Sequence, residues 1–157
     1  MGGKINVIEK ISEIFDIFHD AGIEAWEGNE DKLMLTIGCT YLAELINPDF
    51  DFFYLEIDEI ENLQMDCWTP QGTAKKMLKS FDAIFNASLE VSSSEVKDGR
   101  VFVYFRQGDD DLDYVGGALS FIASGATIFQ HDKKEISLEL LSSICRDYWN
   151  SKKKQNL

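Results

Sequence analysis

Apolar residues near the start of the chain recur at helical spacing. They lie three or four positions apart and would share one face of a helix: Ile8, Ile11, Phe15 and Phe18. The pattern predicts an amphipathic helix over Ile5–Phe18. Gly22 follows the pattern and is a typical residue just beyond a helix end.

The chain then changes to an alternation of period two, which is typical of strands with one buried face. Turn-forming residues separate the apolar runs, most clearly at Asn47-Pro48-Asp49. The predicted strands are Ile23–Trp26, Leu33–Ile37, Tyr41–Ile46, Phe52–Ile57 and Leu63–Trp68. Short strands separated by turns predict an antiparallel meander.

A second helix is expected after the break at Thr69–Gly72, with Thr73 as its cap. Its apolar residues again have helical spacing: Met77, Leu78, Phe81, Ile84 and Phe85. Lys75, Lys76 and Lys79 lie mostly on the opposite side, as on a solvated helix face.

Further along, Lys97-Asp98-Gly99 separates two β-rich runs, Leu89–Ser94 and Arg100–Arg106. Asp-Gly between such runs predicts a hairpin. A last helix, capped by Ser137 or Asp132, would carry the apolar residues Leu140, Leu141, Ile144 and Tyr148.

The segment QGDDDLDYVGGALSF allows two interpretations. Leu112, Val115, Leu119 and Ile122 are spaced as in a helix, and Asp109–Asp113 would then form its first turn, where negative charge is favourable. Gly116 and Gly117 argue against a helix, since each costs about 1 kcal/mol relative to alanine there. The alternative is a β-hairpin, with Ser124-Gly125 turning between Ala118–Ala123 and Ala126–Gln130.

Composition indicates one domain over residues 1–157, with residues 136–157 forming an added C-terminal helix and a frayed basic tail. The chain has 28 acidic against 15 basic residues and a net charge of -13. Such a charge disfavours binding to nucleic acid and to anionic membranes. Solubility alone is enough to explain the negative charge, which would also attract a basic protein.

The three cysteines are far apart, and the first residues contain no apolar signal segment. We therefore expect reduced thiols and a cytoplasmic location. Cys67 is interpreted as a buried core residue because no basic partner is near it in the sequence.

The acidic residues do not match a known metal motif. A calcium loop starting at Asp109 would need Gly and Glu where the chain has Tyr114 and Ser120. A second cluster of acidic residues follows a predicted strand and consists of Glu56, Asp58, Glu59 and Glu61. We assign no catalytic, metal-binding or cofactor-binding residue and expect no cofactor.

Aromatic residues on the polar side of predicted strands are the remaining candidates. Phe50, Phe52, Tyr54 and Trp68 do not all fit one core face. If some are exposed, they mark a surface for contact with another protein.

The chain resembles the YbjN-like proteins, which share the type III secretion chaperone-like fold. The resemblance is strongest over Ala74–Phe129, through the helix AKKMLKSFDAIFN, the strand pair ASLEVSSSEVKDGRVFVYFRQ, the acidic GDDDLDYV and the run ALSFIASGATIF. FHDAGIEAWEGNEDKLMLTI is similar to the family's first helix and hairpin. The resemblance rests on pattern and spacing over most of residues 5–130. It implies that the acidic break leads into a long helix packed on the sheet, and that the protein is a chaperone or regulator without catalytic residues, often dimeric.

We therefore expect an α+β fold in which helices pack against a central antiparallel sheet, in the order α-βββ-α-ββ-α-α. The expected function is that of a non-enzymatic, chaperone-like or regulatory module, which buries a segment of a protein partner and forms a homodimer. One alternative is an immunity protein that neutralises a basic toxin. Another is a metal-dependent enzyme that uses Asp109–Asp113 or Glu56–Glu61.

Overall fold

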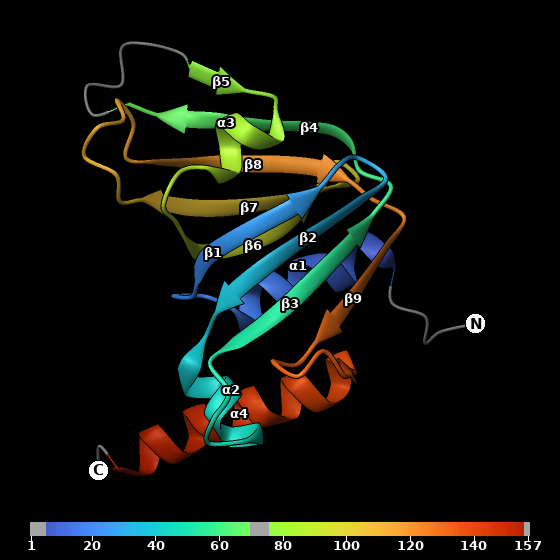
Figure 1. Ribbon diagram of the computed structural model, residues 1–157, viewed down its shortest axis with the longest axis vertical. Coiled ribbons are helices and arrows are strands. Elements are labelled where there is room, and N and C mark those ends of the chain that lie inside the picture. The colour runs from blue at the N-terminus through green and yellow to red at the C-terminus, as the bar shows by residue number, and fades with distance from the viewer. Residues whose placement is uncertain (1–5, 70–75, 156–157) are drawn as a thin grey trace.

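The computed structural model describes residues 6–69 and 76–155, which form a ten-stranded antiparallel sheet and four helices (Figure 1). Neighbouring strands follow the order β10-β9-β3-β2-β1-β6-β7-β8-β4-β5. In chain order the elements are α1 (Val7–Ile17), β1 (Gly22–Gly28), β2 (Lys32–Gly38), α2 (Thr40–Ile46), β3 (Phe52–Asp58), β4 (Glu61–Trp68), β5 (Lys76–Leu78), α3 (Phe81–Phe85), β6 (Leu89–Lys97), β7 (Arg100–Gln107), β8 (Gly116–Ile122), β9 (Gly125–Phe129), β10 (Glu135–Ile136) and α4 (Leu138–Gln155).

Two bent strands close the sheet on itself. β3 continues into β4, and β8 into β9, after a short bend in each case. The pairing of one bent strand with the other runs through both bends, since Asp58 lies opposite Gly125 and Glu61 opposite Ile122. The backbone N–H of Ser124 also donates to the carbonyl oxygen of Asp58 at 2.9 Å. Because β3 pairs with β2 and β8 pairs with β7, the paired strands form a closed ring.

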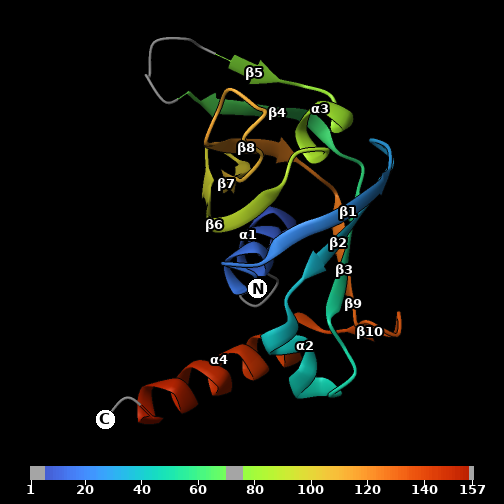
Figure 2. The ribbon, with the colours of Figure 1, turned by 60° about the vertical axis from the view of Figure 1, so that its left-hand side comes forward.

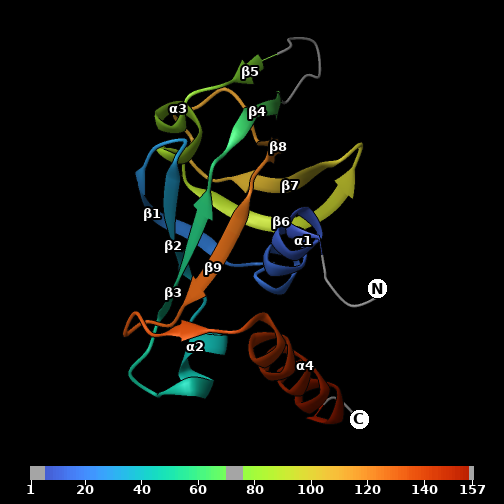
Figure 3. The same cartoon turned by 90° about the vertical axis from the view of Figure 1, so that its right-hand side faces the viewer.

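Helix α1 lies against the inner surface of this bent sheet, where it contacts β6, β7 and β9 (Figures 2 and 3). The ring of Phe15 packs edge-to-face on Phe105 of β7, with ring centroids 6.5 Å apart. Phe18, just beyond the helix, packs on Phe53 of β3 at 5.2 Å. All four rings are fully buried, so the helix joins the two halves of the sheet into one core.

Short polar side chains cap the starts of α1 and α4. Asn6 Oδ1 accepts a hydrogen bond from the N–H of Ile8 at 2.8 Å at the start of α1. Ser137 Oγ accepts one from the N–H of Leu140 at 3.1 Å, which confirms Ser137 as the cap of the last helix. Ile5, where the first helix was expected to begin, lies outside the described residues.

Helix α4 packs across α1 and α2 at one end of the molecule. The ring of Tyr148 lies 4.8 Å from that of Tyr41, and Trp149 stacks on His19 at 5.4 Å. The helix continues through the basic part of the tail to Gln155, and residues 156–157 lie outside the described residues. No helix of the described part of the chain is both long and apolar enough to cross a membrane.

The predicted hairpin at Asp98-Gly99 is confirmed. β6 and β7 pair up to Lys97 opposite Arg100, and Asp98 and Gly99 both have positive φ, 54° and 74°. This is the backbone geometry that an Asp-Gly turn between twisted strands requires. Four of the five strands predicted in the first half of the chain are also present, as β1, β2, β3 and β4.

The predicted helix starting at Asp109–Asp113 is wrong. Leu112 and Val115 lie in a non-helical connection, and strand β8 follows. Five of the seven residues of β8 are buried in this central strand, which pairs with β7 on one side and β4 on the other. A run that is apolar on both faces can imitate helical spacing. The alternative interpretation, a β-hairpin, correctly predicted strands on both sides of Ser124-Gly125, but these two strands do not pair with each other. β8 pairs with β7 and β4, and β9 with β3 and β10.

Two further expectations are corrected. Tyr41–Ile46 lies in helix α2 rather than in a strand, and it buries Leu42 and Ala43 on one side. The second predicted helix is instead the edge strand β5 followed by the short helix α3; its expected cap Thr73 lies outside the described residues. The fold is therefore α+β with an antiparallel sheet, as expected, but the order α-βββ-α-ββ-α-α is not the order observed.

Glycines in β8 provide a test of its close pairing. A Cβ atom at Gly117 would lie 2.6 Å from the carbonyl oxygen of Asp66 on β4, and one at Gly116 would collide with the carbonyl oxygen of Phe105 on β7. We expect Gly117→Ala to lower the free energy of unfolding by about 1–3 kcal/mol, the usual cost of overpacking. Gly108→Ala is the control, because its nearest neighbour would be at 3.7 Å. Equal urea denaturation midpoints for the two variants would contradict the assigned register.

Candidate functional site

The outer surface of β1, β2, β3 and β9 carries apolar and aromatic side chains that none of the described helices covers. It faces the viewer in Figure 1, with α1 behind the strands. The strand register sets its residues in two rows. The first row is Ala25, Thr36, Tyr54 and Phe129, and the second is Glu27, Met34, Glu56 and Thr127. Because residues two apart on a strand point to the same side, both rows share one surface, which we call the outer sheet face.

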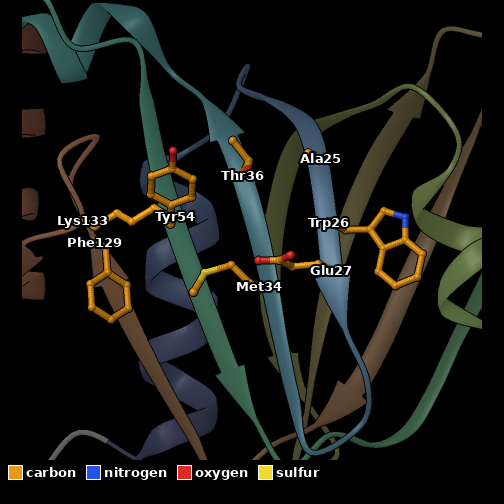
Figure 4. A pocket seen from close by; sticks show the side chains of 8 residues that line it. All are labelled: Ala25, Trp26, Glu27, Met34, Thr36, Tyr54, Phe129 and Lys133. Atoms are coloured by element: carbon orange, nitrogen blue, oxygen red, sulfur yellow. The ribbon is translucent and has the colours of Figure 1, made fainter.

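A cavity of about 310 Å³ lies on the outer sheet face, lined by Ala25, Trp26, Glu27, Met34, Thr36, Tyr54, Phe129 and Lys133 (Figure 4). The Glu27 side chain extends across β2 toward Met34, whereas the Trp26 side chain points away toward α3. There, Trp26 Nε1 donates to Asn86 Oδ1 at 2.8 Å and the indole stacks on Phe81. The side chains available to an occupant therefore come mainly from the two rows and from Lys133.

Lys133 places a positive charge beside the aromatic side chains. Its Nζ lies 5.5 Å from the centroid of the Tyr54 ring, within the range of a cation–π interaction. The residue stands in the turn between β9 and β10 with φ of 69°. The turn is fixed by the backbone bonds from Lys133 N–H to Gln130 O and from Gln130 N–H to Lys134 O, both 2.8 Å.

Three carboxylates lie on or beside the outer sheet face. Glu56 pairs with Lys32, with Oε1 and Nζ 3.3 Å apart. Glu27 and Glu24 form no ion pair with any residue that the structure describes. Glu24 is displaced by a bulge in β1, and its carboxylate lies over Gly22 and Gly38, whose missing side chains leave it room. Against these three carboxylates the face carries two cations, Lys32 and Lys133, so a small excess of negative charge remains.

His131 holds one end of the outer sheet face together. Its ring stacks on Phe50 and Phe52, with centroid distances of 5.3 and 5.4 Å. Its Nδ1 accepts hydrogen bonds from the backbone N–H groups of Asp51 at 2.9 Å and Phe52 at 3.3 Å. The histidine therefore joins the turn after β9 to the start of β3, next to Tyr54.

The structure brings together three of the four aromatic residues expected to form a contact surface. Phe50, Phe52 and Tyr54 are half-buried neighbours at the outer sheet face. Trp68 lies on the other half of the sheet, where it is 46% exposed and stacks on Tyr104 at 6.2 Å. That these residues contact a partner stays a prediction.

Two residues of the acidic run Asp109–Asp113, its first and its last, have structural contacts. Asp109 Oδ2 accepts from the N–H of Ser88 at 2.9 Å, and Asp113 pairs with Lys76 at 2.7 Å. A hydrogen bond from Lys76 holds the pKa of the Asp113 carboxyl below its usual range. In Glu56–Glu61, Glu56 is engaged by Lys32. Within residues 6–69 and 76–155, no three His, Cys, Asp or Glu side chains are grouped so that they could hold a metal ion.

The three cysteines are free thiols, and Cys67 is buried as expected. Burial raises the pKa of Cys39 to about 11, and hydrogen bonds from neighbouring residues lower it only in part. Burial also raises the pKa of Cys67 and of Cys145. None of the three therefore has the lowered pKa of a reactive thiol.

Comparison with known proteins finds no matching family model, no matching curated protein and no matching solved structure. Sequence reasoning missed Met34, Phe129 and Lys133, which complete the cavity around Tyr54. The alternation of Thr127 and Phe129 with buried Ala126 and Ile128 was the signal that could have placed Phe129 on an outer face.

The cysteine pKa values lead to a test by alkylation with iodoacetamide. With a pKa of about 11, roughly one Cys39 thiol in a thousand is ionised at pH 8. We expect Cys145, which is only partly buried, to react first in the folded protein, and Cys39 to react at least tenfold more slowly. Raising the pH toward 11 should speed the reaction of Cys39, and denaturant should make all three react alike. Rapid modification of Cys39 at pH 8 in folded protein would contradict the assignment.

Proposed function

We propose that this protein is a non-enzymatic binding module that receives a segment of a basic protein partner on its outer sheet face. The observation that carries the proposal is the cavity of about 310 Å³, lined by Tyr54, Phe129 and Met34, on a sheet surface that no described helix covers. Aromatic residues and methionine are enriched where proteins contact each other. Binding is favoured when a partner removes such side chains from water, because burying apolar surface lowers the free energy.

Charge supports a basic partner. Glu24 and Glu27 form no ion pair among the described residues, and the whole chain carries a net charge of -13. Complementary charge increases the rate of encounter and excludes acidic competitors. The apolar side chains would then supply short-range affinity, and the carboxylates the choice of partner.

The resemblance to YbjN-like proteins is a second reason to propose a chaperone-like or regulatory role. It rests on the sequence pattern over most of residues 5–130 and is strongest over Ala74–Phe129. Within that range, β5 and α3 stand where a helix was expected, and β8 and β9 replace the long helix that the resemblance implied after the acidic break. An immunity protein that neutralises a basic toxin would use the same charge complementarity. The identity of the partner distinguishes these two roles.

Partner capture with a matched pair of variants tests the proposal. Phe129→Thr removes an aromatic side chain from the outer sheet face, while Phe102→Thr removes a half-buried one from the outer side of β7. We expect a stoichiometric basic protein to bind the wild-type chain and Phe102→Thr, and to bind Phe129→Thr at least tenfold more weakly by calorimetry with the purified partner. Binding should weaken in high salt.

Several outcomes would change this proposal. A basic nuclease as partner would identify an immunity protein. A partner that is lost with EDTA would favour a metal-dependent role for the carboxylates. Equal binding of the partner to Phe129→Thr and Phe102→Thr would contradict the outer sheet face as the contact surface.

We also propose that the chain forms a homodimer, because it has many partly exposed aromatic side chains and resembles a family that is often dimeric. Light scattering at high micromolar concentration should give twice the mass of the 157-residue chain. A monomer mass under these conditions would contradict this proposal without affecting the binding of a different partner.

A further inference from the structure

Lys133 occupies a place on the outer sheet face that fits a cation from another protein. We propose that the Tyr54 ring is a binding site for a lysine or arginine side chain of the partner, and that Lys133 fills this site until the partner displaces it. This inference rests on the proposed function, which it deepens by naming the chemical group that is recognised.

The contacts of Lys133 are those of a displaceable group. Its backbone is fixed in the turn after β9, but its side chain is exposed and forms no ion pair with any described residue. Among the described residues, its Nζ interacts with the Tyr54 ring, whose centroid is 5.5 Å away. A single exposed cation–π contact is weak, so an incoming cation with further contacts can replace it.

The surroundings of the ring favour a second cation over an anion. Glu27 lies in the neighbouring row of the same surface, and its side chain extends across β2 toward Met34 (Figure 4). Unlike Glu56, which is paired with Lys32, Glu27 is free of ion pairs among the described residues. A guanidinium or ammonium group bound at the ring would also be attracted by this carboxylate.

The size of the cavity agrees with one long side chain. Pockets for drug-sized ligands usually measure about 300–1,000 Å³. The cavity here, at about 310 Å³, is at the lower end of that range and is lined by Thr36, Met34 and Phe129 beside the ring. The methylene groups of lysine or arginine can lie along these apolar side chains while the charged end reaches the ring or Glu27.

The direct test uses blocked amino acids as probes. N-acetyl-arginine methylamide, N-acetyl-lysine methylamide and the uncharged N-acetyl-norleucine methylamide are titrated into protein carrying ¹³C-labelled tyrosine rings. We expect the two cationic probes to shift the Tyr54 ring resonances saturably, and norleucine to do so at least fivefold more weakly. Equal saturation by norleucine would show an apolar site without charge recognition and would overturn the inference.

Two pairs of variants separate the site from general charge attraction. Lys133→Gln should lower the apparent Kd of the arginine probe about two- to fivefold, the factor expected for one lost competing cation–π contact. Lys134→Gln removes the same charge from the next residue and should change the Kd less than 1.5-fold. Tyr54→Phe should retain binding, and Tyr54→Leu should lose it. If Lys133→Gln and Lys134→Gln behave alike, displacement of Lys133 is excluded.

These results can be told apart from failure of the proposed function. If binding of a purified partner depends on Phe129 but is unaffected by Lys133→Gln and Tyr54→Leu, the binding module is supported and the cation site is contradicted. If the arginine probe binds saturably at Tyr54 but no partner is found whose binding depends on Phe129, the cation site is supported and the proposed function is contradicted.

Discussion

Continuous antiparallel pairing between two bent strands is the constraint on which the rest of the structure depends. β3 and β4 run along β9 and β8, and the register is kept across both bends from Asp58–Gly125 to Glu61–Ile122 before it shifts by one residue ahead of Gln64–Ser120. The bends turn two halves of one sheet toward each other, so that α1 can bury Phe15 and Phe18 between them. Hydrogen bonding between backbones thus creates the enclosed space, and apolar side chains fill it.

The same register creates the outer sheet face. Alternation sends Phe53, Leu55 and Ile57 inward, so Tyr54 and Glu56 must point outward. Pairing of β3 with β9 then sets Phe129 beside Tyr54, although the two are far apart in the sequence. Helix α1 covers the inner surface of this half of the sheet, whereas no helix of the described residues covers the outer surface, so the aromatic side chains there stay partly exposed. Removing them from water is a source of free energy that the folded chain alone does not use.

Local signals in the sequence predicted the elements whose structure depends on neighbours in the chain. Asp98-Gly99 predicted the β6–β7 hairpin and Ser137 predicted the start of the last helix. The alternation of apolar and polar residues predicted β2 and β3. Prediction failed where distant strands decide the structure. β8 is held between β7 and β4 by close contacts at Gly116 and Gly117, and no local pattern reveals those two partners. The helical spacing of Leu112 and Val115 was therefore accidental.

The candidate site likewise combines residues that local patterns reveal with residues that only the pairing of distant strands brings together. Phe52 and Tyr54 could be singled out because they alternate with core residues on one strand. Phe129 and Lys133 could not be connected to them, since only the β3–β9 pairing and the turn before β10 bring the four together. A site assembled from separate strands needs the topology before it can be recognised.

Charge alone would make this chain a poor discriminator among basic proteins. A net charge of -13 attracts any cation over distances of about a Debye length, roughly 8 Å at physiological salt, and gives no preference for one place on the surface. A ring that already holds Lys133 adds a short-range condition, because an incoming cation must replace an existing contact. In the proposed site, weakly bound cations would leave Lys133 in place, whereas a segment that also covers Phe129 and Met34 would have further contacts with which to displace it. Displacing Lys133 would cost every ring-binding cation the same, so in the proposed site only a segment that also contacts Phe129 and Met34 would stay bound at low partner concentration.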